Sequence, residues 1–134
     1  MKKNVAFICW GNSCRSIMAE ALARHFLGAS LTASSAGISP LGFVARETIQ
    51  VLAELGVATQ GLHSKGLGEI DLQDCHLLVN LTDYSLKPIL PASFPGLLAH
   101  RPVQDPYGRG LESYRESRDD IIRLVNQEIC QWLG

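Results

Sequence analysis

The feature that most constrains this chain is a short polar loop near the amino terminus, set between an apolar run and an amphipathic segment. Residues 5–8 are apolar, residues 17–22 have helical character, and the loop between them reads Cys9-Trp10-Gly11-Asn12-Ser13-Cys14-Arg15-Ser16. The pattern predicts a buried strand, a tight turn and a helix. Such a turn leaves backbone N–H groups without partners at the positive end of the helix dipole, where they form a nest that fits a tetrahedral oxyanion.

The residue types in this loop point to a nucleophile placed beneath a bound anion. Cys9 at the rim of the nest is expected to be held as thiolate, because the field that binds an anion also stabilises a negative sulfur. Arg15 supplies a planar fork that holds two oxygens of the same anion. Gly11 and Asn12 tolerate the positive φ values that a nest needs, and Ser13 and Ser16 supply hydroxyl groups. The alternative is that Cys9 is an inert cysteine buried at the end of a strand.

Length and charge limit the classes of function that the chain can serve. Its 134 residues suffice for one domain, over 1–134, with a single core. The net charge of −1 gives no electrostatic case for a nucleic acid or an anionic membrane. No apolar run approaches the ~18–20 residues that span a bilayer. We therefore expect a cytoplasmic protein with no nucleic-acid and no membrane partner.

The cysteines and histidines do not form a recognisable metal site. The four cysteines are expected to be free thiols in that compartment. No two of them are separated by two residues, and the four histidines are scattered, which excludes the usual zinc patterns. Cys75 and Cys130 lie among apolar residues and are predicted to be small core side chains. We expect no metal and no cofactor.

Apolar patterns along the chain alternate between strand and helix periods. Strands are predicted over residues 4–8, 30–35, 76–81 and 97–103, and helices over 17–27, 44–55 and 111–133. A turn at 36–37 ends the second strand. Strands separated by helices favour an α/β fold with a parallel sheet covered on both faces. Ligands bind beyond the carboxyl ends of such strands, where Cys9 is placed.

A thiolate that attacks a phosphoester needs an acid to protonate the leaving oxygen. The best candidate is Asp105, in a loop that follows the fourth predicted strand and so emerges at the same sheet edge as Cys9. The alternative is an ordinary turn, since a proline follows the aspartate and two glycines lie nearby. Asp71, Asp74 and Asp83 are weaker candidates because none is expected in a comparable loop after a strand.

Together these motifs resemble the low-molecular-weight protein-tyrosine-phosphatase family and its arsenate-reductase relatives. The resemblance rests on Cys9-x₅-Arg15-Ser16 and, much later in the chain, on Asp105-Pro106-Tyr107. Shorter matches extend it over the whole chain, at Ala19-Glu20, Ser35-Ala36-Gly37, Tyr114-Arg115 and Arg118-Asp119. The family's fold is a four-stranded parallel sheet with helices on both sides, a three-layer α/β/α sandwich with its phosphate-binding loop after the first strand.

The resemblance implies catalytic roles for three residues. Cys9 matches the nucleophile that forms a phosphocysteine, and Arg15 matches the arginine that clamps the phosphoryl oxygens. Asp105 matches the acid that protonates the leaving group and then acts as base on water. The residues expected to contact substrate are Trp10, Gly11, Asn12, Ser13, Cys14, Ser16 and Tyr107.

Four further residues match supporting positions of the family. Ser16 corresponds to a serine whose hydroxyl steadies the thiolate. Asn12 and Ser35 correspond to residues that hold the loop in its shape. Cys14 corresponds to a second loop cysteine that forms a reversible disulfide with Cys9 and protects it from over-oxidation.

The chain departs from the family pattern at four places. Ile17 stands where a proline is usual, and Gly108 replaces the second aromatic residue after Asp-Pro. Leu62 stands where a histidine is common, with His63 one place later. Ser13 replaces a larger aliphatic residue, as in the arsenate reductases or the bacterial phosphatases that act on phosphoarginine. These departures leave the phosphoryl chemistry intact and leave the substrate open.

The resemblance implies hydrolysis of a protein phosphotyrosine or a small aryl phosphate, with phosphate or arsenate as a ligand. Phosphoarginine hydrolysis and thiol-dependent arsenate reduction are alternatives. Arsenate reductases that carry their own resolving cysteines have them at the positions of Thr82 and Lys87. Arsenate reduction by this chain would therefore need an external thiol such as glutathione. A binding module without turnover would be expected to lose Cys9 or Asp105, and a P-loop nucleotide hydrolase needs a Gly-x₄-Gly-Lys motif that is missing.

Overall fold

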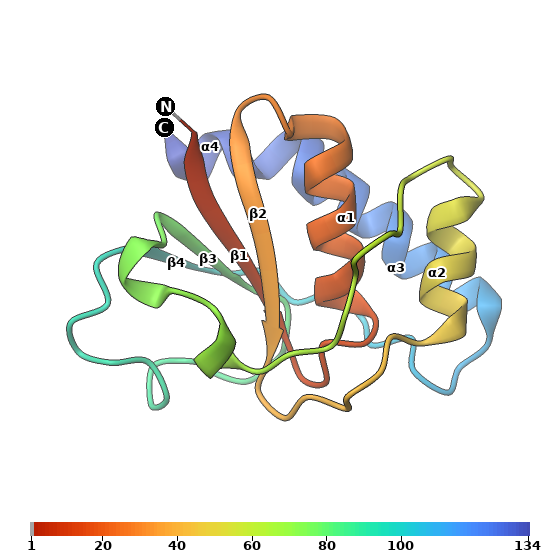
Figure 1. Ribbon diagram of the computed structural model, residues 1–134, viewed down its shortest axis with the longest axis horizontal. Helices are drawn as coiled ribbons and strands as arrows, with labels where there is room; N and C mark the ends of the chain where they lie inside the picture. The colour runs from red at the N-terminus through yellow and green to blue at the C-terminus, as the bar shows by residue number, and fades with distance from the viewer. Residues whose placement is uncertain (1) are drawn as a thin grey trace.

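The computed structural model describes residues 2–134 and contains a four-stranded parallel sheet (Figure 1). Its strands are β1 (Lys3–Cys9), β2 (Leu31–Gly37), β3 (Leu77–Asn80) and β4 (Leu97–His100). They lie in the order β2-β1-β3-β4, and each neighbouring pair is parallel. The predicted α/β fold is confirmed.

The α-helices pack together against one face of this sheet. α1 (Arg15–Leu27) connects β1 to β2, and α2 (Arg46–Ala53) follows β2. After β4 come α3 (Leu111–Arg123), a π-helical turn (Leu124–Glu128) and α4 (Ile129–Leu133). α1, α2 and α3 contact one another. Across residues 2–134, no helix combines the length and the apolarity that crossing a bilayer requires.

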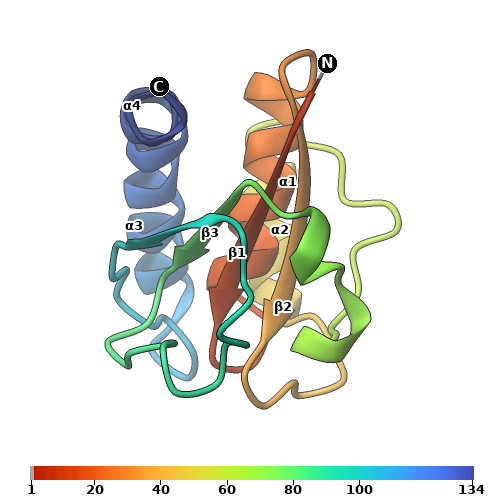
Figure 2. The same ribbon diagram turned by 90° about the vertical axis from the view of Figure 1, so that its left-hand side faces the viewer.

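The opposite face of the sheet is covered by short 3₁₀ helices rather than by α-helices. Phe7 of β1 belongs to the core cluster on the helix side, and Ile8 to the cluster on the other side. That second cluster is completed by η1 (Leu67–Glu69), η2 (Leu72–Asp74) and the segment 84–96. Figure 2 shows this segment on the side of the strands away from α1. Because both faces are covered, β1 is apolar throughout its buried part.

Element boundaries differ from the predicted ones where distant segments pair. Residues 36–37, predicted as a turn, continue β2 because Gly37 pairs with the end of β1 and donates its N–H to Lys65. β4 ends at His100 because its partner β3 ends at Asn80. The predicted last helix is interrupted by its π-helical turn.

Gly37 lies where β2 passes closest to the loop that follows β1. A Cβ atom here would lie 2.8 Å from the nitrogen of Asn12 and from the carbonyl oxygen of Trp10, and 2.9 Å from the carbonyl carbon of Gly11. All three are backbone atoms, which cannot move aside as the end of a flexible side chain does. The approach of β2 to the loop therefore requires glycine.

Replacing Gly37 by alanine is expected to lower the free energy of unfolding by about 1–3 kcal/mol, as for other overpacked sites. It should also weaken binding of inorganic phosphate, because the clash falls on the loop backbone. Thermal unfolding and titration calorimetry measure the two effects. Gly68→Ala is the matched control, since a Cβ there meets nothing within 4 Å. Equal melting temperatures and phosphate affinities in the two variants would contradict the close approach.

Candidate active site

The backbone between β1 and α1 turns its carbonyl groups outward. The carbonyl oxygens of residues 9, 10 and 11 accept hydrogen bonds from N–H groups of the segment 38–41, at 3.0, 2.8 and 2.9 Å. Within residues 2–134, no backbone N–H of residues 10–16 has an acceptor. Asn12 has a left-handed φ of 47°. A turn with free N–H groups at the start of a helix is the arrangement expected of an anion nest.

The side chain of Asn12 ties the loop to three parts of the fold. Its Nδ2 donates to Ser16 Oγ in α1 (2.7 Å) and to Ser35 Oγ in β2 (2.9 Å). Its Oδ1 accepts from the backbone N–H of Lys65 (2.8 Å). These buried bonds offset the cost of a left-handed φ at a residue other than glycine. Asn12 and Ser35, the predicted supports, thus lie together behind the loop.

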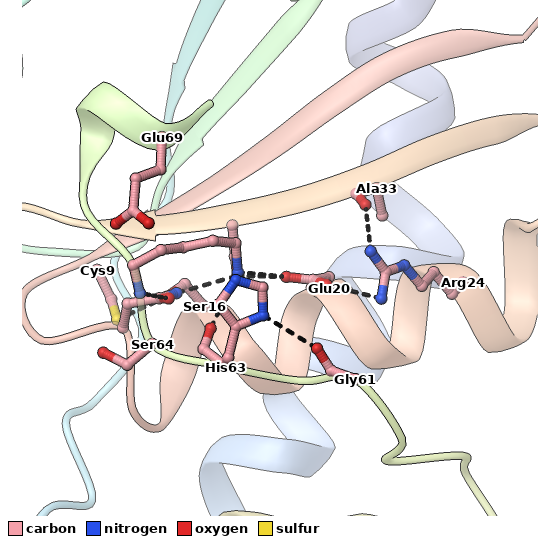
Figure 3. Close-up of polar contacts among 12 residues, drawn as sticks. Cys9, Ser16, Glu20, Arg24, Ala33, Gly61, His63, Ser64 and Glu69 are labelled. Atoms are coloured by element: carbon pink, nitrogen blue, oxygen red, sulfur yellow. Dashed lines mark hydrogen bonds and ion pairs between the residues drawn. The ribbon is translucent and has the colours of Figure 1, made fainter. Parts of the chain in front are cut away.

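Cys9 is the last residue of β1, and its side chain is buried beside the first turn of α1. Its sulfur lies 2.9 Å from Ser16 Oγ, and Figure 3 shows the two side chains facing each other beneath the loop. Only 2% of Cys9 is exposed. The sulfur therefore has a hydroxyl neighbour and the amino end of a helix close to it, as the sequence predicted.

Arg15 is held in place by the ends of two other strands. Its Nη1 donates to the carbonyl oxygens of Leu81, after β3, and of Val103, after β4, both at 3.2 Å. Its Nη2 lies 3.6 Å from Asp105 Oδ2. Its Nε is buried without a partner in residues 2–134. A buried donor left unpaired is costly, and a bound oxyanion would satisfy it.

Cys9, Arg15 and Asp105 line one cavity of about 120 Å³ at the carboxyl edge of the sheet. The Asp105 side chain is 55% exposed, and its Oδ1 accepts from the N–H of Tyr107 (3.1 Å). Trp10 and Tyr107, also at this cavity, are 45% and 50% exposed. The three residues predicted to be catalytic are therefore brought together, with aromatic side chains at the mouth.

The loop after β3 forms a second rim beside this cavity. The ring of Tyr84 lies 5.4 Å from that of Trp10. Asp83, which was not expected in a loop comparable to that of Asp105, lies in this loop and lines a neighbouring hollow together with Arg15 and Asp105. That expectation was wrong, because the loops after the neighbouring strands β3 and β4 emerge at the same edge of the sheet. Of the two carboxylates, Asp105 is the one paired with Arg15.

Cys14 lies beneath the loop and is turned toward the helix layer. Its sulfur is 3.4 Å from the hydroxyl of Tyr114 in α3. Burial raises the pKa of the Cys14 thiol, and it raises the pKa of Tyr114 as well. Cys14 therefore remains a protonated thiol at neutral pH, five positions after Cys9 in the same loop.

The other two cysteines lie apart from this cavity. Cys75 is buried just before β3, at the opposite end of that strand. Cys130, predicted to be a core side chain, is exposed on α4 because the core covers one side of that helix only. Among residues 2–134, no three His, Cys, Asp or Glu side chains come together as metal ligands would.

Sequence reasoning missed several residues that hold the loop from behind. Glu20 and Lys65 are buried and form an ion pair, and Thr48 Oγ1 donates to the carbonyl oxygen of Ser13 (2.8 Å). Ser13 Oγ itself is buried without a partner in the described chain. The position of Glu20 within the otherwise apolar segment 17–22 was a signal that this glutamate is buried. The sequence around Lys65 gave no such signal, because the burial of Lys65 depends on distant segments.

Comparison with known proteins identifies the family. Residues 4–133 match the family described as low molecular weight phosphotyrosine protein phosphatase. The chain belongs to this family. The predicted resemblance is thus confirmed, and the enzymes of this family are phosphatases and arsenate reductases.

Individual relatives carry both kinds of name. The chain is 34% identical to arsenate reductase 2 of Staphylococcus epidermidis over 126 residues, which is 92% of this chain and 94% of that protein. It is 28% identical to the protein-arginine-phosphatase of Bacillus subtilis, covering 92% and 93%. Among solved structures, an arsenate reductase in its phosphate-binding state is 25% identical, with a TM-score of 0.84, covering 97% and 98%.

Substituting Arg15 by lysine tests the role of its fork. Lysine keeps the charge and loses the planar donor pair, so binding of inorganic phosphate should weaken at least about tenfold, the value of one charge-assisted hydrogen bond. Titration calorimetry measures the affinity. Arg123→Lys, on the exposed side of α3, is the control and should bind as the wild type. Unchanged affinity in Arg15→Lys would mean that Arg15 serves the fold alone.

Proposed function

We propose that the protein is a cysteine-dependent phosphatase that hydrolyses phosphomonoesters of the phosphotyrosine type. The observation that carries the proposal is one cavity lined by Cys9, Arg15 and Asp105, over a loop with free backbone N–H groups. A nucleophile, a cationic clamp and an acid are the three groups that this reaction needs. The free loop thiols fit a reducing compartment, so we place the activity in the cytoplasm.

In the first step, the Cys9 thiolate attacks phosphorus. A P–S bond forms while the bond to the leaving oxygen breaks, and Asp105 gives its proton to that oxygen. The loop N–H groups and Arg15 stabilise the charge on the three remaining oxygens. In the second step, the Asp105 carboxylate takes a proton from water as the water oxygen attacks phosphorus. The P–S bond then breaks, which releases phosphate and restores the thiolate.

The shape of the mouth supports an aryl leaving group. Trp10, Leu41 and Tyr107 line the cavity and remain about half exposed. Flat apolar walls of this kind suit a phenyl ring that enters with its phosphate foremost. Ser13 lies at the same cavity, and its buried hydroxyl has no partner among the residues that the structure describes, which supports phosphoarginine as a second substrate class, because its leaving group carries N–H donors.

Arsenate reduction is the alternative that the names of several relatives favour. The first step is shared, since a thiolate attacks arsenic as it attacks phosphorus. Release of arsenite then needs a second thiol. Thr82 and Lys87 occupy the positions where relatives carry that thiol, and the Thr82 hydroxyl is bonded to Asn80 Oδ1 (2.7 Å). An external thiol would be required for turnover.

Asp105→Asn separates a hydrolase from a reductase. A poor leaving group needs the proton of Asp105 most, so hydrolysis of phosphotyrosine should slow about 10²–10⁴-fold. Hydrolysis of p-nitrophenyl phosphate should slow less, because its leaving group departs without a proton. Stopped-flow and steady-state assays on both substrates, with phosphoarginine alongside, measure the two losses. Cys9→Ser is the control for a loss of the nucleophile and should abolish both.

The same preparations are assayed for arsenate reduction coupled to thioredoxin or to glutathione. The wild type should hydrolyse phosphotyrosine with only enough reductant to keep Cys9 reduced, and should reduce arsenate poorly with thioredoxin. Efficient reduction with thioredoxin, combined with phosphotyrosine hydrolysis that is indifferent to Asp105→Asn, would overturn the proposal.

Mild oxidation should form a disulfide between Cys9 and Cys14. Peroxide converts the Cys9 thiolate to a sulfenic acid, and the Cys14 thiol, which lies in the same short loop, displaces water from it. Peptide mapping should find the two peptides joined and activity restored by dithiothreitol. Cys14→Ser should instead lose activity irreversibly, through sulfinic acid. Sulfinic acid at Cys9 of the wild type, with Cys14 free, would contradict this.

A further inference from the structure

We propose that a hollow beside the catalytic cavity is a subsite for an arginine side chain next to the phosphorylated residue of a protein substrate, and that Asp83 selects this arginine. The proposal rests on the proposed function, because it assigns a substrate class to the same site. It adds a preference among phosphotyrosine sequences that the phosphoryl chemistry itself does not require. The space that Asp83 lines is named the Asp83 hollow below.

The Asp83 hollow adjoins the cavity in which phosphate is expected to bind. It has a volume of about 300 Å³ and is lined by Trp10, Arg15, Thr82, Asp83, Tyr84 and Asp105. Trp10, Arg15 and Asp105 also line the catalytic cavity, so the two spaces share a boundary. Leu41 and Tyr107 line the catalytic cavity alone. A phosphotyrosine ring between these walls therefore leaves the Asp83 hollow to a neighbouring residue of the substrate.

Arg15, on the boundary, carries a donor that the protein leaves unsatisfied. Only 6% of Arg15 is exposed, and its Nε has no hydrogen-bond partner among residues 2–134. A buried donor without a partner is costly, so a ligand atom is expected to reach it. Because Arg15 lines both spaces, a substrate that satisfies this donor lies directly beside the Asp83 hollow.

Asp83 supplies a negative charge that the protein does not compensate. Its side chain is exposed, and it forms no ion pair within residues 2–134. Lys87 shares a separate hollow with Asp83 but does not pair with it. Arg15 is paired with Asp105 and is engaged by the phosphoryl group in the proposed reaction, which Asp105 enters protonated. The Asp83 carboxylate therefore remains free to attract a cation of the substrate.

The aromatic walls of the hollow favour arginine over lysine. The rings of Trp10 and Tyr84 lie 5.4 Å apart at an angle of 42°, and Tyr84 is 63% exposed. A guanidinium is planar, stacks on aromatic faces and offers paired donors to a carboxylate. The ammonium of lysine is instead a strongly hydrated point charge. A carboxylate beside exposed aromatic rings thus matches the chemistry of an arginine side chain.

The loop that carries Asp83 is fixed on both sides of this residue. Asn80 Oδ1 accepts hydrogen bonds from the backbone N–H and the hydroxyl of Thr82, at 3.0 and 2.7 Å. Thr82 Oγ1 accepts in turn from the N–H of Tyr84 at 3.1 Å. The position of the Asp83 backbone is thus set before a substrate binds, which lowers the entropy lost on binding.

The test compares phosphotyrosine peptides that differ only in an arginine or a citrulline next to the phosphotyrosine. Citrulline has nearly the shape of arginine and carries no charge. One pair of peptides has the variable residue before the phosphotyrosine and a second pair has it after, and phosphate release gives kcat/KM for each. In at least one pair, the wild type should favour the arginine peptide about fivefold, the value of an exposed ion pair. Added salt should reduce this ratio.

Two variants assign the preference to Asp83. Asp83→Asn should bring the ratio of the two kcat/KM values to about one, and Asp83→Lys should bring it below one, because a cation there repels the arginine. Each ratio is taken within one preparation, so a change in the active fraction cancels. Glu116→Gln is the matched control: Glu116 is exposed on α3, and its loss changes the net charge equally without touching the hollow. This variant should keep the wild-type ratio.

A wild-type ratio near one overturns the proposal, as does a wild-type ratio that persists in both Asp83 variants. An equal loss of preference in Glu116→Gln also overturns it, because net charge would then account for the effect. In these three cases phosphotyrosine hydrolysis itself stands. Failure of the wild type to hydrolyse any of the peptides would contradict the proposed function, and the subsite with it.

Discussion

The unpaired backbone N–H groups of residues 10–16 impose a cost that the rest of the molecule offsets. Free donors at the end of a buried strand are unfavourable until an anion binds, and the backbone must adopt a left-handed φ at Asn12 to present them. The stabilising interactions lie behind the loop and are the hydrogen bonds between the Asn12 side chain and the segments that contact it. The nest that we propose for the anion is therefore formed before any ligand arrives, which is the condition for effective electrostatic catalysis.

Parallel strand order explains how residues far apart in the chain reach this site. β1 lies in the centre of the sheet between β2 and β3, so its carboxyl end is surrounded by the ends of the others. β2 supplies Ser35 and the close approach of Gly37, while Arg15 is held by carbonyl groups that follow β3 and β4. Asp105, the proposed acid, emerges from the same edge. The site is thus a property of the sheet's topology and not of the loop alone.

The sequence predicted the features whose signal lies in one contiguous segment, or that follow from a general rule of parallel sheets. The strand, the loop and the helix around Cys9 are contiguous, and Asp105 followed from the rule that parallel strands end at one edge. The strand boundary at Gly37, the burial of Lys65 and the exposure of Cys130 depend on pairing between distant segments, which apolar periodicity does not report. Even a resemblance that names the loop residues is silent on Lys65, because the burial of that side chain and its ion pair with Glu20 appear only once its neighbours are in place.

The fate of the intermediate, rather than its formation, distinguishes the activities found in this family. A thiolate in an anion nest attacks phosphate and arsenate alike, so the loop does not discriminate between them. The next step requires either water with a base or a second thiol. Near Cys9 the proposed base is Asp105, whose side chain is open to water and lies 3.6 Å from Arg15. The other thiol at this cavity, Cys14, is buried against Tyr114, and burial raises its pKa, so it is a weak nucleophile at neutral pH. Water is therefore better placed than a thiol to attack this intermediate, and the arrangement favours hydrolysis.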